Sequence, residues 1–126
     1  MTETSPILHT ASSVLAVIPH HQCEAWLGDA IESLVAQTRA LDGIVVVDDA
    51  GGDPPTSIVG RFPHVTLLKV AARANVGPYR ISQQVIRETA YDGYLWQDAD
   101  DWSMPERLES LLEAAERTGA ELVGSQ

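Results

Sequence analysis

Short apolar runs alternate along the chain with longer stretches in which apolar residues recur every three or four positions. The runs at residues 14–18, 44–47, 65–70 and 94–97 predict strands that are buried on both faces of a sheet. Pro19 is expected to end the first of them, and residues 121–123 predict a short fifth strand. This spacing of short apolar runs is typical of strands that are connected by helices.

The stretches between the runs have helical spacing. Amphipathic helices are predicted over residues 24–40 from Leu27, Ile31, Leu34 and Val35, from Pro78 to near residue 92 from Ile81, Val85 and Ile86, and up to Gly119 from Leu108, Leu111, Leu112 and Ala115. Asp53 before Pro54 predicts a capped short helix through residue 59, and Ser103 with Glu106 forms the pattern of a capping box. The alternation predicts an α/β fold, an open, mostly parallel sheet with helices on both faces.

Composition narrows the class of protein. The 126 residues fit one domain, with residues 1–12 predicted as a flexible leader and residues 13–126 as the folded part. Eight basic and 18 acidic residues give a net charge of −10, which argues against a nucleic-acid partner. Cys23 is the single cysteine, so a disulfide within the chain and a cysteine-based zinc site are excluded. Without a membrane span or a signal peptide pattern, the sequence predicts a cytoplasmic protein.

Polar residues follow the predicted strands, at the edge where open parallel sheets bind ligands. They are His20 and His21 after the first strand, Asp48 and Asp49 after the second, and Asp98, Asp100 and Asp101 after the fourth. Carboxylates crowded in this way require a cation or hydrogen-bond donors, and their hard oxygens suit Mg²⁺ or Mn²⁺ bridging the phosphates of a ligand. A purely structural interpretation stays open, because aspartates also stabilise turns and helix N-termini.

Two familiar nucleotide motifs are absent. No Gly-x-Gly-x-x-Gly follows the first strand, and the single lysine, Lys69, is not part of a Walker loop. Five other segments occur in a recognisable order: VLAVIPHHQ (14–22), AIESLVAQT (30–38), IVVVDDAGGD (44–53), NVGPYRISQQ (75–84) and YLWQDADDWSMPERL (94–108). Together they resemble the nucleotide-sugar glycosyltransferases of family 2, which have the GT-A fold.

The resemblance implies a role for each matching residue. Asp49 would hold the nucleotide base, Asp98 and Asp100 would meet the ribose and diphosphate, and Asp100 with Asp101 would bind Mn²⁺ or Mg²⁺. The remaining nucleotide-binding candidates are Pro19, His20, His21, Asn75, Gly77 and Arg80. The chain departs from the family pattern at residues 20–22, where a Thr-Tyr-Asn loop is usual, at residues 51–52, where Ser-Thr is usual, and at residues 82–83, where Arg-Asn is frequent.

The implied function is the donor-binding half of an inverting glycosyltransferase that uses a nucleotide sugar, with a UDP-sugar favoured. Family members are substantially longer, so the chain looks truncated at its C-terminus and the catalytic base is expected beyond Gln126. Two alternatives remain open at this point. One is a receiver-like signalling domain, which the acidic pair at residues 48–49 resembles, and the other is a non-catalytic nucleotide-binding module.

Overall fold

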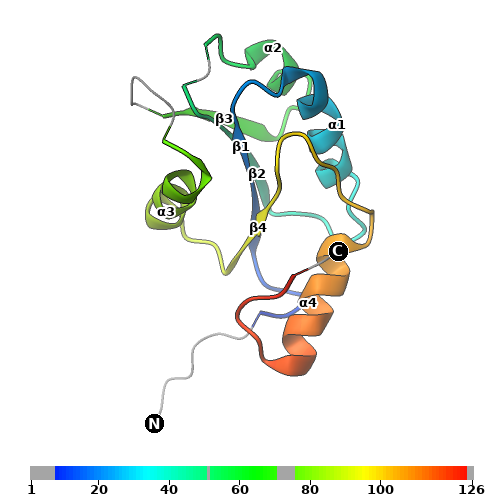
Figure 1. Cartoon of the computed structure of the whole chain (residues 1–126). Coiled ribbons are helices and arrows are strands. Elements are labelled where there is room, and N and C mark those ends of the chain that lie inside the picture. The colour runs from blue at the N-terminus through cyan, green and yellow to red at the C-terminus, as the bar shows by residue number, and fades with distance from the viewer. Residues whose placement is uncertain (1–7, 51, 71–75, 125–126) are drawn as a thin grey trace.

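A four-stranded, all-parallel sheet forms the centre of the molecule (Figure 1). The computed structural model describes residues 8–50, 52–70 and 76–124. The strands are β1 (Val14–His20), β2 (Gly43–Asp48), β3 (Val65–Lys69) and β4 (Gly93–Trp96), in the order β3-β2-β1-β4. The helices are α1 (Glu24–Val35), α2 (Thr56–Val59), α3 (Pro78–Glu88) and α4 (Arg107–Thr118). The predicted open parallel α/β sheet is confirmed.

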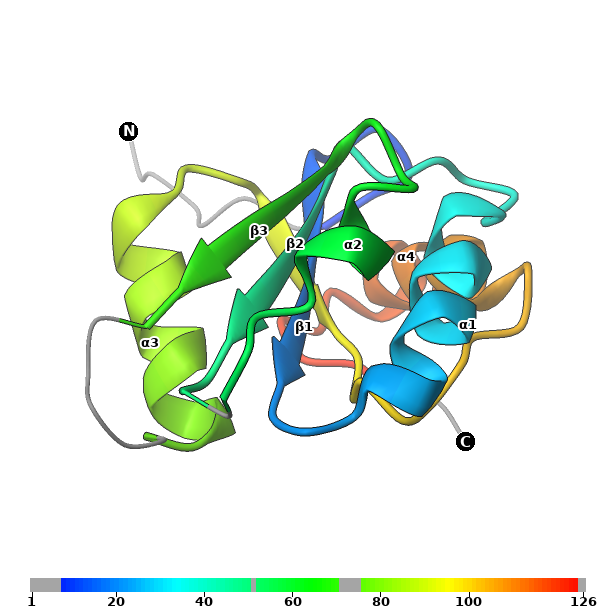
Figure 2. The same ribbon diagram turned by 90° about the horizontal axis from the view of Figure 1, so that it is seen from above.

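The sheet is buried on both faces, as the continuous apolar runs predict. Alternate residues of β1 point to opposite sides, so Ala16 and Ile18 pack with α1, α2 and α4, while Leu15 and Val17 pack with α3. Figure 2 shows α3 on one side of the sheet and the other three helices on the opposite side. Two residues predicted to face this core are exposed instead, Val35 at the end of α1 and Ile86 on α3.

Strand β1 continues through Pro19 and ends at His20, so the prediction that Pro19 ends the strand is wrong. Val17 accepts the Gln97 N–H on the β4 side, and His20 accepts the Asp49 N–H on the β2 side. Successive residues bond to opposite neighbours, and Pro19 therefore faces the β4 side. Strand β4 pairs only with residues 14–17, so the missing N–H of Pro19 costs no ladder hydrogen bond.

Helix α1 ends at Val35, five residues before the predicted end, because the chain after it is held by the loop before α4. The side chain of Gln37 is buried and donates to the Met104 carbonyl (2.8 Å), and the Thr38 N–H donates to the Pro105 carbonyl (2.8 Å). The amide oxygen of Gln37 accepts the Leu108 N–H at the start of α4 (2.9 Å). These contacts replace the next turn of the helix.

The two predicted helix caps are wrong. Helix α2 begins at Thr56 after the cap residue Pro55 and has no side-chain cap. Pro54 precedes Pro55, and a residue that precedes a proline is kept out of the helical region, so the helix does not begin directly after Asp53. At α4 the cap residue is Glu106, again without a side-chain bond. The Ser103 hydroxyl donates to the side chain of Gln97 instead, which takes it away from the helix.

The two ends of the described chain lie beside β4 and the start of β1. Residues 121–123 form no strand, and Leu122 is exposed, so the predicted fifth strand is wrong for lack of a pairing partner among the described residues. Near the other end, Leu8 packs against the core, and the guanidinium of Arg39 donates to the carbonyls of Thr10 (3.0 Å) and Ser12. Among the described helices, none is both long and apolar enough to span a membrane.

Candidate functional site

One cleft of about 190 Å³ lies at the carboxyl ends of β1, β2 and β4. Its lining residues are Pro19, His20, His21, Cys23, Asp49, Pro78, Asp98, Ala99 and Asp100. Strands β2 and β3 extend the sheet on one side of β1, and β4 lies on the other side. The order in which the chain adds strands to the sheet therefore reverses between β1 and β4. Open α/β sheets bind ligands beside this kind of switch point.

Asp49 is a buried carboxylate (3% exposed) directly after β2. Its two oxygens accept the backbone N–H groups of Val76 (2.7 Å) and Gly77 (2.9 Å), which lie just before α3. A negative charge at a helix N-terminus is favourable. Gly77 has φ +88°, a backbone conformation that a residue with a side chain rarely adopts. Asp49 therefore fixes the approach of α3 to the cleft.

The two histidines at the end of β1 differ in exposure. His20 is 1% exposed, with Nδ1 3.3 Å from the Asp48 carboxylate and Nε2 3.3 Å from the Cys23 nitrogen. His21 is exposed, and its Nδ1 donates to the Asp49 carbonyl (3.0 Å). Both line the cleft, but it is the ring of His21 that solvent and a ligand can reach.

The acidic turn that follows β4 carries three exposed carboxylates, those of Asp98, Asp100 and Asp101. The Asp101 N–H donates to the Asp98 carbonyl (3.1 Å), which closes the turn. Asp98 and Asp100 line the cleft, while Asp98 and Asp101 line a second, larger hollow of about 900 Å³ beside α4. The turn thus separates two hollows, and Asp98 borders both.

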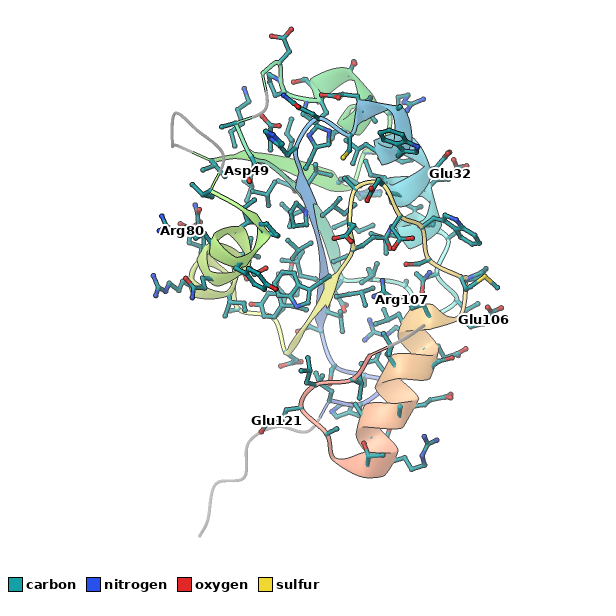
Figure 3. All side chains as sticks on the ribbon, in the orientation of Figure 1. Glu32, Asp49, Arg80, Glu106, Arg107 and Glu121 are labelled. Carbon is teal, nitrogen blue, oxygen red and sulfur yellow. The ribbon has the colours of Figure 1, made fainter. Side chains whose placement is uncertain are left out.

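Arg107 supports the turn from the α4 side, and Figure 3 shows it on the side of α4 nearest to β4. Its guanidinium donates to the Trp96 carbonyl (3.1 Å) and to the Ser103 hydroxyl (3.1 Å). Partial burial lowers the pKa of the Arg107 guanidinium, and the negative charge of Asp101 opposes that shift. Arg107 is therefore a cation close to the acidic turn.

Most of the predicted site residues line the cleft, whereas Gly77, Arg80 and Asp101 do not. Gly77 is held by Asp49 at the start of α3, next to Pro78 in the cleft wall. Arg80 is exposed on the side of α3 turned away from the sheet (Figure 3) and does not line the cleft. Asp101 borders the second hollow. Asn75 lies outside the described residues.

Two residues of the site have no motif that would reveal them. Gln97 is buried, and its amide nitrogen donates to the Ala30 carbonyl (3.1 Å) and contacts the Asp101 carbonyl (3.3 Å), so it ties the acidic turn to α1. Cys23 lines the cleft, and burial together with the charge of Asp100 raises the pKa of its thiol. A polar residue directly after a strand is a weak signal for Gln97, and Cys23 offers none.

The donor set of the acidic turn fits a divalent metal ion that shares its coordination shell with a ligand. The turn offers exposed carboxylate oxygens, which Mg²⁺ and Mn²⁺ prefer. No three His, Cys, Asp or Glu residues in the described ranges are grouped so that they could hold an ion by themselves. Such a metal would have to take further ligands from phosphate oxygens or water, as Mg²⁺ commonly does.

The fold and the cleft define an open parallel α/β domain with carboxylates where the strands end. The family model Glycosyl transferase family 2 matches residues 15–126, and the chain belongs to this family. Because the chain belongs to this family, the alternative of a receiver-like signalling domain is wrong.

Known proteins agree with this assignment. The succinoglycan biosynthesis protein ExoO of Rhizobium meliloti (strain 1021) is 27% identical over 93% of this chain and 34% of its own length. The structure of S. aureus TarS 1–349 with UDP-GlcNAc has a TM-score of 0.69 at 19% identity, covering 85% of this chain and 32% of that one. The mannosyltransferase PcManGT of Pyrobaculum calidifontis with GDP-Man and Mn²⁺ has a TM-score of 0.68 at 20% identity, covering 86% and 35%. The expected GT-A fold is confirmed, and the chain spans about a third of the length of these proteins.

Proposed function

We propose that the chain is the nucleotide-sugar-binding part of an inverting glycosyltransferase and binds its donor together with Mn²⁺ or Mg²⁺. A UDP-sugar is the favoured donor, and a cytoplasmic location belongs to the same proposal. The observation that carries it is the convergence of Asp49 and the acidic turn on one cleft, in a chain of glycosyltransferase family 2. Two proteins of similar fold support it, since TarS was crystallised with UDP-GlcNAc and PcManGT is described with GDP-Man and Mn²⁺.

Each proposed contact follows from where a side chain lies. The base would lie near Asp49, against the wall formed by Pro19, His20 and His21. Asp98 and Asp100, exposed and lining the same cleft, would accept hydrogen bonds from the ribose hydroxyls. Gly77 would contribute at the start of α3, and the proposal of Asn75 as a nucleotide contact rests on the family resemblance of its sequence segment. Arg80 would require a ligand that extends around the start of α3, because it does not line the cleft.

Asp100 and Asp101 are the proposed metal ligands. A bound divalent ion supplies charge stabilisation to a departing diphosphate. The carboxylates of the turn would hold the ion. Its positive charge would offset the repulsion between the turn and the diphosphate, which are both negatively charged. The buried Gln97 bonds the backbone of the turn at Asp101, and the half-buried Arg107 bonds the Trp96 carbonyl just before it, while the carboxylates of the turn stay exposed.

Calorimetry with UDP tests this proposal. Binding is expected with Mn²⁺ or Mg²⁺ and is expected to be lost, or to weaken strongly, in EDTA. Equal affinity in EDTA would remove the metal from the proposal and leave a metal-independent binding module. Absence of UDP and GDP binding under all conditions would overturn the proposal as a whole.

A further inference from the structure

One histidine in the wall of the cleft is almost completely buried. His20 is 1% exposed although it ends β1 at the rim of the sheet. Nδ1 lies 3.3 Å from Oδ1 of Asp48, the last residue of β2, and Nε2 lies 3.3 Å from the backbone nitrogen of Cys23. The ring therefore connects the end of one strand with the residue that precedes α1.

These two contacts select one form of the ring. A backbone N–H can only donate, so Nε2 of His20 must be the acceptor for Cys23. The ring hydrogen is then on Nδ1 and is donated to Asp48. A doubly protonated ring would turn an N–H of Nε2 against the Cys23 N–H. The geometry thus corresponds to the neutral ring with the hydrogen on Nδ1.

The segment between His20 and α1 has few other supports. Gln22 has φ +55°, a left-handed conformation that is costly for a residue with a side chain and persists only where the surroundings enforce it. His21 is tied to the Asp49 carbonyl, and the Cys23 thiol donates to the His21 carbonyl (3.3 Å). His21 and Cys23 of this segment, residues 21–23, form part of the cleft wall, and Asp98 and Asp100 of the acidic turn line the same cleft.

We propose that His20 is a positioning residue of the nucleotide cleft: its neutral ring, fixed by Asp48, holds the Cys23 amide and thereby the wall at residues 21–23. The inference rests on the proposed function, because it concerns how that cleft is shaped. The Glu24 carboxylate lies 3.9 Å from the same nitrogen, Nε2. Loss of the hydrogen bond between the Cys23 amide and Nε2 is therefore expected to weaken nucleotide binding.

The charged groups nearest to His20 are two carboxylates. Asp48 on β2 lies 3.3 Å from Nδ1, and Glu24 on α1 lies 3.9 Å from Nε2. Asp98 and Asp100 line the same cleft as His20. Because only the bond to the Cys23 amide concerns the cleft wall, its loss is expected to change the shape of the cleft rather than to unfold the chain.

Two substitutions separate the two ring nitrogens. His20→Gln places an amide oxygen near the position of Nε2 and does not titrate, so it is expected to keep the Cys23 bond. His20→Asn reaches only the position of Nδ1, so it is expected to keep the Asp48 bond and lose Cys23. His20→Asn should bind UDP with Mn²⁺ about tenfold more weakly than His20→Gln, the effect of one buried hydrogen bond.

A matched control separates this effect from the loss of any histidine. His64→Gln changes an exposed histidine before β3 and should bind UDP with Mn²⁺ like the unsubstituted chain. Equal affinities for the two His20 variants would overturn the proposal.

Nuclear magnetic resonance of the ligand-free chain tests the inference independently of nucleotide binding. The ¹⁵N shifts of the His20 ring should report hydrogen on Nδ1 and a lone pair on Nε2, and the Cys23 amide signal should shift in His20→Asn more than in His20→Gln. A ring with its hydrogen on Nε2, or a Cys23 amide signal that is the same in both variants, would overturn the inference. If UDP does not bind at all, the proposed function fails, while this measurement still decides the role of His20 in holding the wall.

Discussion

At the scale of single residues, Asp49 stabilises the fold in addition to making the proposed contact with the ligand. Its carboxylate accepts the N–H groups of Val76 and Gly77, so Asp49→Ala should lower the free energy of unfolding by about 2 kcal/mol even without nucleotide, as expected for hydrogen bonds to a buried charged group. Urea unfolding measures the change. Asp53→Ala, an exposed aspartate in the same loop, should stay within about 0.5 kcal/mol of the unsubstituted chain. Equal losses in both variants would contradict the role of Asp49.

The proposed metal ligands are tested by changes that keep side-chain size. Asp100→Asn and Asp101→Asn should each reduce the gain in UDP affinity that Mn²⁺ provides, because an amide oxygen carries no charge to hold the ion. Asp29→Asn, exposed on α1, is the control. A Mn²⁺ effect unchanged in Asp101→Asn would restrict the metal site to the cleft side of the turn, since Asp101 borders the second hollow.

At the scale of elements, the start of α4 depends on a side chain from the loop that follows α1. Gln37 is buried and bonds both the Leu108 N–H and the Met104 carbonyl. Gln37→Ala should therefore cost about 2 kcal/mol of stability, since it leaves these groups without partners. Chemical denaturation measures this, with Gln83→Ala on the exposed face of α3 as the matched control. A loss no larger than that of the control would mean that α4 starts without help from Gln37.

The start of β1 is held by two carboxylates, which predicts a response to acid. Asp42 accepts the Val14 N–H (2.7 Å) and Asp92 accepts the Ser13 N–H (2.8 Å). These backbone hydrogen bonds are the main cause that lowers the pKa of each carboxyl, with Arg39 adding to the effect at Asp42 and the Ser13 hydroxyl at Asp92. Carboxyls with a lowered pKa in the folded state stabilise it above the unfolded pKa.

That stabilisation is lost as the pH falls through the folded pKa, because the unfolded chain then binds more protons. Stability should therefore decline below about pH 4, the usual value for an aspartate. Asp42→Asn should show a smaller decline than the unsubstituted chain in urea unfolding at successive pH values. Glu113→Gln, exposed on α4, should follow the unsubstituted curve. An identical decline in Asp42→Asn would rule out this carboxyl as a source of acid sensitivity.

The sequence predicts the element types well and their ends poorly. Continuous apolar runs locate β1 to β4 because burial on both faces requires them. The end of α1 and the start of α4 are not predictable from local patterns. Gln37 bonds Leu108, 71 positions away, and the Ser103 hydroxyl bonds the side chain of Gln97 before the helix. Those bonds outweigh a local capping box.

The location of the site is predictable from the sequence, but the packing of its side chains is not. The carboxyl ends of parallel strands must meet at one edge, so Asp49 and the acidic turn could be placed together from the sequence. Three other features depend on side-chain packing, which the spacing of residues in the sequence does not predict. They are the burial of His20, the position of the acidic turn between two hollows and the position of Arg80.

At the scale of the whole molecule, we predict that residues 1–126 bind the donor without transferring its sugar. Transfer requires a general base within hydrogen-bond reach of the acceptor hydroxyl. The cleft carboxylates Asp49, Asp98 and Asp100 are proposed for base, ribose and metal, and a metal-bound carboxylate is a poor base because the cation stabilises its ionised form. Incubation of the chain with UDP-sugars and candidate acceptors should release UDP only slowly, by hydrolysis. Saturable transfer to a defined acceptor would contradict this assignment of roles.

The strand order has a further consequence, for the sequence of events during folding. All strand pairs are parallel, so none can form through a tight hairpin, and the last strand in the chain, β4, pairs with the first. The contacts that join them connect residues as far apart as Ser13 and Asp92, 79 positions along the chain. Pairings of this kind form late, because a long loop must close before they contribute. The acidic turn depends on β4 for its place, so we expect the cleft to be assembled in the last step of folding, after the layer of β1, β2 and β3 exists.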